Sequence, residues 1–148
     1  MPEQMCIYDG VKTNPRLLVE AACTWAKQDY GTRDCRFFRL LDLCERALED
    51  GAPRLRRGDI FYLARDYGFD MTICREFKFD NNLWAPLSRY LLMFRPRLAK
   101  IICPKKADID SVDFERVWHE TVHPNTFFYA RNWQEAVKAY ESKDVSAA

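Results

Sequence analysis

The amino-acid sequence predicts an all-α fold, with six to seven short helices in one compact domain that spans residues 1–148. Apolar residues recur at helical spacing along most of the chain, and the alternation typical of strands is scarce, with "REFKF" the nearest example. Capping and turn residues divide the chain into short segments. A chain of 148 residues of which 48% are hydrophobic is large enough to bury one core.

Two amphipathic helices are predicted in the first third of the chain. Asn14 is a suitable N-cap for the first helix, and Pro15 fits its first position, where no backbone N–H is needed. Gly31 can end this helix. Asp34 caps the second helix and Gly51 ends it, with an apolar stripe between them.

Shorter helices are predicted in the rest of the chain. After the "APRLRR" connector, two of them cover 60–67 and about 70–78. An apolar helix follows in "DNNLWAPLSRYLLMFRPRLAKIICP", which Pro96 should kink or restart. The C-terminal helical region, about 108–148, begins with a helix capped near Asp110 and ends with one in "RNWQEAVKAYESK". The four tryptophans lie at helical spacing and are assigned to the core.

Charge is unevenly distributed along the chain. The net charge is −2 for residues 1–50, +7 for residues 51–107 and −4 for residues 108–148. Between residues 81 and 107 there are six basic residues and no acidic one. A basic centre suggests a polyanionic partner, and the alternative is that the acidic ends neutralise it within the fold.

Residues 60–78 have the spacing of a helix-turn-helix. Counting from Ile60, the fifth position is Ala64, which is small enough for a close helix crossing, and the ninth is Gly68, which tolerates a left-handed backbone. The apolar positions around them are Leu63, Tyr67, Phe69, Cys74 and Phe77. The stretch resembles the generic helix-turn-helix of the lambda-repressor type. The alternative is two short core helices joined by a glycine turn.

This resemblance implies that the second helix enters the major groove of DNA. Arg75 would then contact guanine and Thr72 a phosphate or a thymine methyl, although Asp70 and Glu76 place negative charge on the same face. The residues expected to bind nucleic acid are Met71, Thr72, Arg75, Lys78, Arg54, Arg56, Arg57, Arg89, Arg97, Lys100, Lys105 and Lys106. Alternatively, the arginines cover the apolar helix with their stems.

The two histidines of the chain lie in "HETVH", which resembles the H-E-x-x-H motif of zincin metallopeptidases. The resemblance implies His119 and His123 as zinc ligands and Glu120 as the general base. Pro124 follows where the active helix of that family continues, and no third ligand has a recognised context. We interpret the two histidines instead as residues at a helix C-terminus, where the helix dipole favours them. We therefore expect no metal, no cofactor and no catalytic residue.

The function expected from these patterns is nucleic-acid binding, by a small DNA-binding regulator or an accessory subunit of a nucleoprotein complex. DNA or RNA is the expected partner, and a protein partner or a homodimer stays open. A non-enzymatic protein-interaction module, such as an adaptor or inhibitor, is the alternative, and a zinc-dependent hydrolase is the second alternative. We expect no membrane span and a cytoplasmic location, because no long apolar run or signal-peptide pattern occurs and no two of the six cysteines form a C-x-x-C pair.

Overall fold

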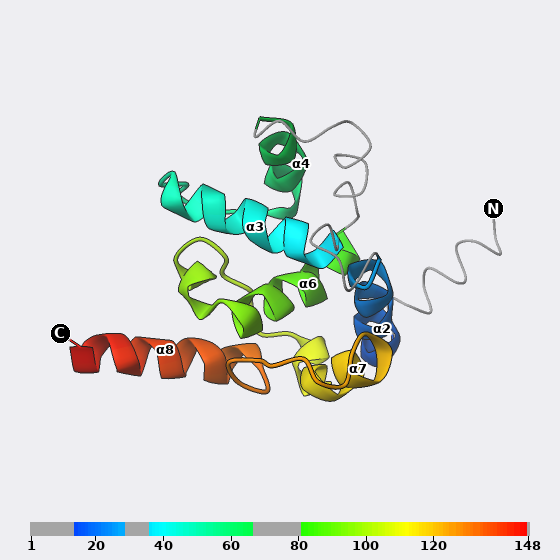
Figure 1. Ribbon diagram of the computed structural model, residues 1–148. Helices are drawn as coiled ribbons and strands as arrows, with labels where there is room; N and C mark the ends of the chain where they lie inside the picture. The colour runs from blue at the N-terminus through cyan, green and yellow to red at the C-terminus, as the bar shows by residue number, and fades with distance from the viewer. Residues whose placement is uncertain (1–13, 29–35, 67–80, 148) are drawn as a thin grey trace.

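The computed structural model describes residues 14–28, 36–66 and 81–147 (Figure 1). All the regular structure in these residues is helical, which confirms the predicted all-α fold in one compact domain. The α-helices are α2 (Pro15–Ala26), α3 (Arg36–Glu49), α4 (Arg57–Asp66), α6 (Asn81–Phe94), α7 (Phe114–Thr121) and α8 (Trp133–Ala147). Two short 3-10 helices are η1 (Pro96–Lys100) and η2 (Asp108–Ser111).

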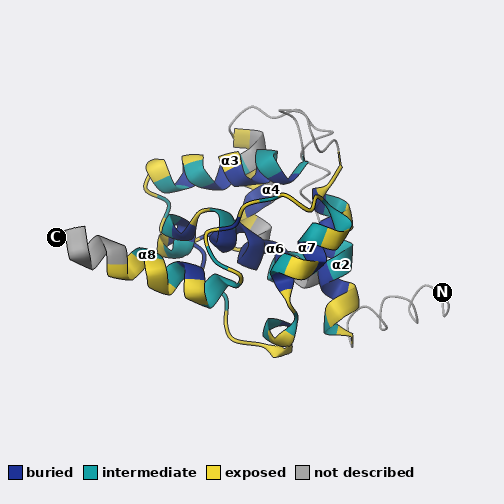
Figure 2. Cartoon of the chain, turned by 60° about the horizontal axis from the view of Figure 1, so that its bottom comes forward, coloured by how far each residue is buried: buried dark blue, intermediate teal, exposed yellow. Residues whose placement is uncertain are grey.

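Helix α6 lies at the centre of the domain. It packs against α2, α8 and η1, while α2 also packs against α7 and α3 packs against α4 (Figure 1). Eight consecutive residues of α6, 86–93, are buried, as expected for a helix covered on several sides. The buried faces of α2 and α3 point toward α6, and their exposed faces point outward (Figure 2).

Local signals set the start of α2 and the end of α3, as predicted. The side chain of Asn14 accepts hydrogen bonds from the backbone N–H groups of Arg16 and Leu17. At the end of α3, Gly51 has a positive φ of 82°, its N–H donates to Leu48, and the N–H of Ala52 donates to Ala47. This is the Schellman pattern of a helix C-terminus. The predicted end of the first helix at Gly31 is wrong, because α2 already ends at Ala26 with Lys27 as its C-cap. The predicted N-cap Asp34 lies outside the described residues.

The predicted interruption at Pro96 is confirmed. Helix α6 ends at Phe94, and Pro96 begins the 3-10 helix η1 after Arg95. Farther along, the helix expected to be capped near Asp110 begins later, because Asp110 lies within η2. Asp113 is the N-cap of α7, and its carboxylate accepts from the N–H of Arg116. Among the described helices, none is long and apolar enough to cross a membrane.

Aromatic rings form the middle of the core. Trp118 is fully buried, and its ring lies 4.9 Å from that of Tyr90, 5.0 Å from Phe37, 5.4 Å from Phe94 and 5.7 Å from Phe128, between ring centroids. These residues come from α3, α6, α7 and the segment before α8, so one cluster joins distant parts of the chain. The assignment of Trp118 to the core is therefore confirmed.

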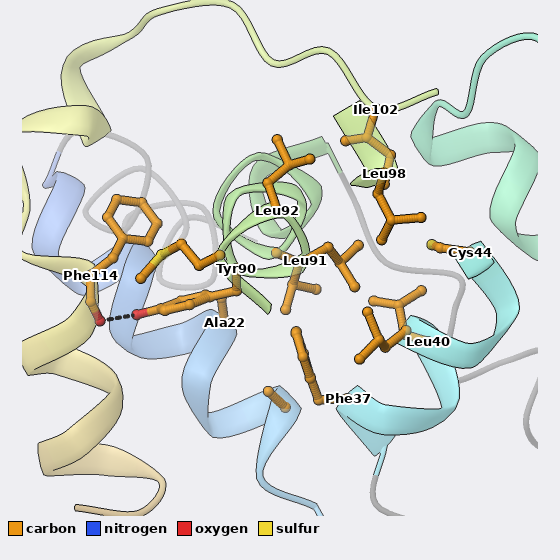
Figure 3. Packing of buried hydrophobic residues seen from close by; sticks show 14 of the residues in the cluster. Ala22, Phe37, Leu40, Cys44, Tyr90, Leu91, Leu92, Leu98, Ile102 and Phe114 are labelled. Atoms are coloured by element: carbon orange, nitrogen blue, oxygen red, sulfur yellow. Dashed lines mark hydrogen bonds between the residues drawn. The ribbon is translucent and has the colours of Figure 1, made fainter. Parts of the chain in front are cut away.

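Two buried cysteines behave as small core residues. The Tyr90 hydroxyl donates to the carbonyl of Phe114, 2.7 Å away (Figure 3). The Cys23 thiol lies 3.3 Å from the same hydroxyl. Burial raises the pKa of Cys23 to about 12 and also raises that of Cys44, so both stay as thiols. Cys103 is a free, exposed thiol. The other three cysteines lie outside the described residues.

Candidate functional site

A cavity of about 370 Å³ opens between the connector after α3, helix α6 and the segment that follows η1. Three of its lining residues are exposed cations, Arg54, Arg56 and Lys105. The other lining residues are Leu55, Trp84, Ala85, Ser88, Arg89, Ile102, Cys103, Pro104 and Ala107. No carboxylate occurs among these lining residues. We call this cavity the basic cleft.

The first wall of the basic cleft consists of two chain segments held side by side. The N–H of buried Leu55 donates to the carbonyl of Ile101 over 2.7 Å. Because Leu55 is anchored in the core and its neighbours are exposed, Arg54 and Arg56 lie at the surface beside it. The backbone N–H of Arg56 also donates to the carboxylate of Asp59, which fixes the start of α4. This wall therefore carries its cations on a constrained backbone.

Helix α6 forms the second wall. Trp84, Ala85, Ser88 and Arg89 recur at helical spacing, so they lie on one side of the helix. Trp84 is half-buried, in contrast to the fully buried Trp118. The hydroxyl of buried Ser88 donates to the carbonyl of Ala85, 2.9 Å away. The lining of the basic cleft thus combines exposed cations with a half-buried indole.

The position of Arg89 in the structure differs from the one predicted from the sequence. It was predicted to contact phosphates at the surface, but its side chain is only 3% exposed and its guanidinium is used inside the protein. Nε donates to the carboxylate of Asp110 over 2.7 Å, Nη1 donates to the carbonyl of Ala85, and Nη2 donates to the carbonyl of Lys105, each over 2.7 Å. Arg89 therefore positions the two walls and does not serve as a surface contact.

Asp110 completes this buried network. Its carboxylate also accepts from the N–H of Ala107, 2.9 Å away, and from the indole N–H of Trp133, 2.8 Å away. Burial acts to raise the pKa of Asp110, but the hydrogen bonds and the charge of Arg89 outweigh it and lower the pKa below its ordinary value. Asp110 is thus ionised at neutral pH and neutralises Arg89. Arg54, Arg56 and Lys105 are then the cations of the cleft that form no ion pair within the described residues.

The other predicted cations lie apart from the basic cleft or outside the described residues. Arg97 is half-buried and pairs with Glu45 over 3.2 Å and with Glu49 over 3.7 Å. Lys100 and Lys106 are exposed, and neither lines the cleft. The side chain of Arg57 is outside the described part of the structure, as are Met71, Thr72, Arg75 and Lys78.

Only the first helix of the predicted helix-turn-helix falls within the described residues. It corresponds to α4, which begins three residues before Ile60. Ile60 is buried and Leu63 is half-buried, so both lie toward the body of the domain as the pattern requires. The second helix and the turn at Gly68 lie outside the described residues, so the motif stays a prediction.

The two histidines do not share a helical face. Helix α7 ends at Thr121, so His119 lies in its last turn and His123 lies beyond it. His119 Nε2 is 2.8 Å from the carbonyl of Thr126, and His123 Nδ1 accepts from the N–H of Asn125. Glu120 pairs with Arg116 over 2.9 Å. Among the described residues, no group of three or more potential metal ligands lies together.

Comparison with protein-family models, with curated proteins and with solved structures found no match to this chain. Guanidinium and ammonium groups bind phosphate oxygens, and an indole offers a flat apolar surface. The exposed cations of the basic cleft are therefore suited to an anionic ligand.

Proposed function

We propose that this protein binds nucleic acid and that the basic cleft contacts the phosphates. The observation that carries this proposal is the set of three exposed cations, Arg54, Arg56 and Lys105, around a cavity whose described lining contains no carboxylate. Within the described residues, none of the three forms an ion pair. Their charge is available to a partner.

A polyanion suits these cations better than a small anion does. Each exposed cation contributes little to the binding of one small anion, because water screens its charge. A nucleic acid instead releases condensed counterions for each phosphate that is neutralised, so that several exposed cations act together. The net charge of +7 over residues 51–107 supports the same kind of partner.

The basic cleft also adjoins the predicted helix-turn-helix. Arg56 immediately precedes α4, which would be the first helix of that motif. Phosphate contacts in the cleft would position the chain, and base contacts would come from elsewhere. This arrangement supports the proposal of a DNA-binding regulator or an accessory subunit of a nucleoprotein complex.

Fluorescence anisotropy with labelled oligonucleotides tests this function. We expect binding at about 50 mM salt that weakens by about 20- to 40-fold at about 200 mM salt, as three phosphate contacts require. The triple variant Arg54→Glu/Arg56→Glu/Lys105→Glu should lose at least about 100-fold in affinity, because it turns attraction into repulsion at three contacts.

The matched control reverses the same amount of charge elsewhere. Arg116, Arg131 and Lys138 are exposed and lie outside the basic cleft. Replacing all three with Glu should weaken binding as well, but by a fold-change less than a tenth of that in the cleft variant. Absence of binding at low salt, or equal losses in the two triple variants, would contradict the proposed function.

A further inference from the structure

We propose that a second cavity, next to the basic cleft, reads a base of the bound nucleic acid, and that Asp108 selects bases that carry an amino group. This inference rests on the proposed function and supplies a base contact in addition to the phosphate contacts of the cleft. The second cavity has a volume of about 480 Å³. It is lined by Pro15 at the start of α2, by residues of the segment 106–111 and by Gln134 near the start of α8. We call it the polar cavity.

The polar cavity and the basic cleft are neighbours. Ala107 lines both of them, and the consecutive residues Lys105 and Lys106 line the cleft and the polar cavity, respectively. Arg89 lines the cleft and donates over 2.7 Å to Asp110, which lines the polar cavity. The two cavities therefore meet at one buried ion pair. A nucleotide whose phosphate lies in the cleft can bring its base to the polar cavity.

The polar cavity carries three side chains that are available to a ligand. Lys106 is exposed and can donate, Asp108 is exposed and can accept, and half-buried Gln134 can do both. Within the described residues, none of these three side chains forms a hydrogen bond or an ion pair. The carboxylate of Asp110, by contrast, is occupied by hydrogen bonds within the domain. Asp108 therefore supplies the available carboxylate of the polar cavity.

A free carboxylate beside a phosphate site favours a base over a second phosphate. It repels phosphate oxygens, whereas it accepts hydrogen bonds from amino groups, and pairing of Asp or Glu with the N4 amino group of cytosine is a known mode of base recognition. Uracil has a carbonyl oxygen in place of that amino group, so its partial charge has the wrong sign for a carboxylate. Lys106 and Gln134 supply donors for the carbonyl oxygens of a base. The polar cavity thus suits a base, and the basic cleft suits its phosphate.

An unpaired base fits this arrangement better than a base in a duplex. In a duplex, each base is enclosed by its neighbours and part of its polar edge is used in pairing, so it does not enter a cavity. An unpaired base can be turned away from the strand and can present its whole polar edge to a protein. Single strands are therefore the probes for this site.

Two single strands that differ only in the polar edge of their bases test the inference in the full-length chain. The strands are about 12 deoxycytidines and about 12 deoxyuridines, which carry the same backbone and the same number of phosphates. We expect the deoxycytidine strand to bind at least about fivefold more tightly at the same salt concentration, the lower end of the discrimination given by a good side chain–base pair.

Replacing Asp108 with alanine removes the acceptor that we assign to the amino group. The ratio of the two affinities should then fall below about twofold. Loss of one negative charge near the cleft should also strengthen the binding of both strands slightly, but by the same factor, because their phosphates are the same. The ratio is therefore a readout that a purely electrostatic or structural role of Asp108 would leave unchanged.

The matched control is Glu141→Ala, which removes an exposed carboxylate of α8 that lies outside both cavities and should leave the ratio unchanged. Thermal unfolding verifies that each variant is folded. A ratio below about twofold in the original protein, or a ratio that Asp108→Ala does not lower, would overturn the inference. In both cases, salt-dependent binding that is lost on charge reversal in the cleft leaves the proposed function standing. Absence of binding to any nucleic acid refutes the proposed function itself.

Discussion

Replacing Asp110 with alanine should destabilise the domain by about 3–5 kcal/mol, because it leaves the buried guanidinium of Arg89 without its counter-charge. Asp110 also accepts from the N–H of Ala107 and from the indole of Trp133, so one change breaks contacts between α6, η2 and α8. The expected fall in melting temperature is about 6–20 °C for a chain of this size. Thermal unfolding of the purified variant measures it.

The neighbouring Asp108 provides a matched control. It lies in the same 3-10 helix and is exposed, so Asp108→Ala should change stability by no more than about 0.5 kcal/mol. The double variant Arg89→Met/Asp110→Leu should recover much of the loss, because it leaves no unpaired buried charge. Similar losses for Asp108→Ala and Asp110→Ala would show that the ion pair does not hold the fold together.

The stabilisation of the fold by Asp110 should depend on pH in a direction that follows from its pKa. The pKa of Asp110 is lower in the folded state than its ordinary value, which is about 4. Its contribution to the stability of the fold is therefore complete at pH values above that ordinary value. The contribution is lost as the pH falls through the folded pKa. The difference in stability between the original protein and Asp110→Asn should therefore be constant near neutral pH and shrink below about pH 4.

Replacing Trp118 with alanine should cost about 3–5 kcal/mol, a loss comparable with that in Asp110→Ala. The side chain is fully buried among the rings of Phe37, Tyr90, Phe94 and Phe128, and its indole N–H donates to the hydroxyl of Thr126 over 2.9 Å. Removal leaves a cavity where four segments meet. Chemical denaturation gives the free energy of unfolding directly.

Two further variants calibrate this result. Trp118→Phe retains a ring and loses the hydrogen bond, so its cost should be smaller, about 1–2 kcal/mol. Phe127→Ala removes a ring that is 83% exposed and should change stability by no more than about 0.5 kcal/mol. A loss below about 1 kcal/mol in Trp118→Ala would mean that the aromatic cluster does not hold the core together.

Local signals in the sequence predicted the fold class and several helix ends. Asn14, Gly51 and Pro96 act through their own side chains and backbone, so their effect is visible in a few neighbouring residues. The start of α7 was misplaced because Asp110 and Asp113 are both suitable caps. The choice depends on Arg89, which lies 21 residues before Asp110 and takes its carboxylate.

The basic cleft could be predicted only in part. The excess of basic residues in the central segment predicted Arg54, Arg56 and Lys105 as binding residues, but it also predicted Arg89. The burial of Arg89 depends on the position of α6 at the centre of the domain. One signal was available, since Arg89 is the single charged residue among residues 81–94. An isolated charge in an apolar helix is typical of a buried ion pair.

Trp84 could not be placed by periodicity. Its helical spacing resembles that of Trp118, yet it is half-buried at a cavity wall. At the cavity, the backbone N–H of Leu55 in the connector donates to the carbonyl of Ile101, 46 residues later in the chain. Such a long-range pairing leaves no periodic pattern in either segment, so only the tertiary structure brings the indole and the cations together.

Photo-crosslinking of a bound oligonucleotide, followed by mass spectrometry of the attached peptides, tests most directly whether nucleic acid occupies the basic cleft. We predict crosslinks in the segment that contains Arg54 and Arg56, in the segment around Lys105 and on Trp84, and we predict their loss in the triple charge-reversal variant. Crosslinks confined to peptides outside the cleft, with the same yield in that variant, would contradict the account.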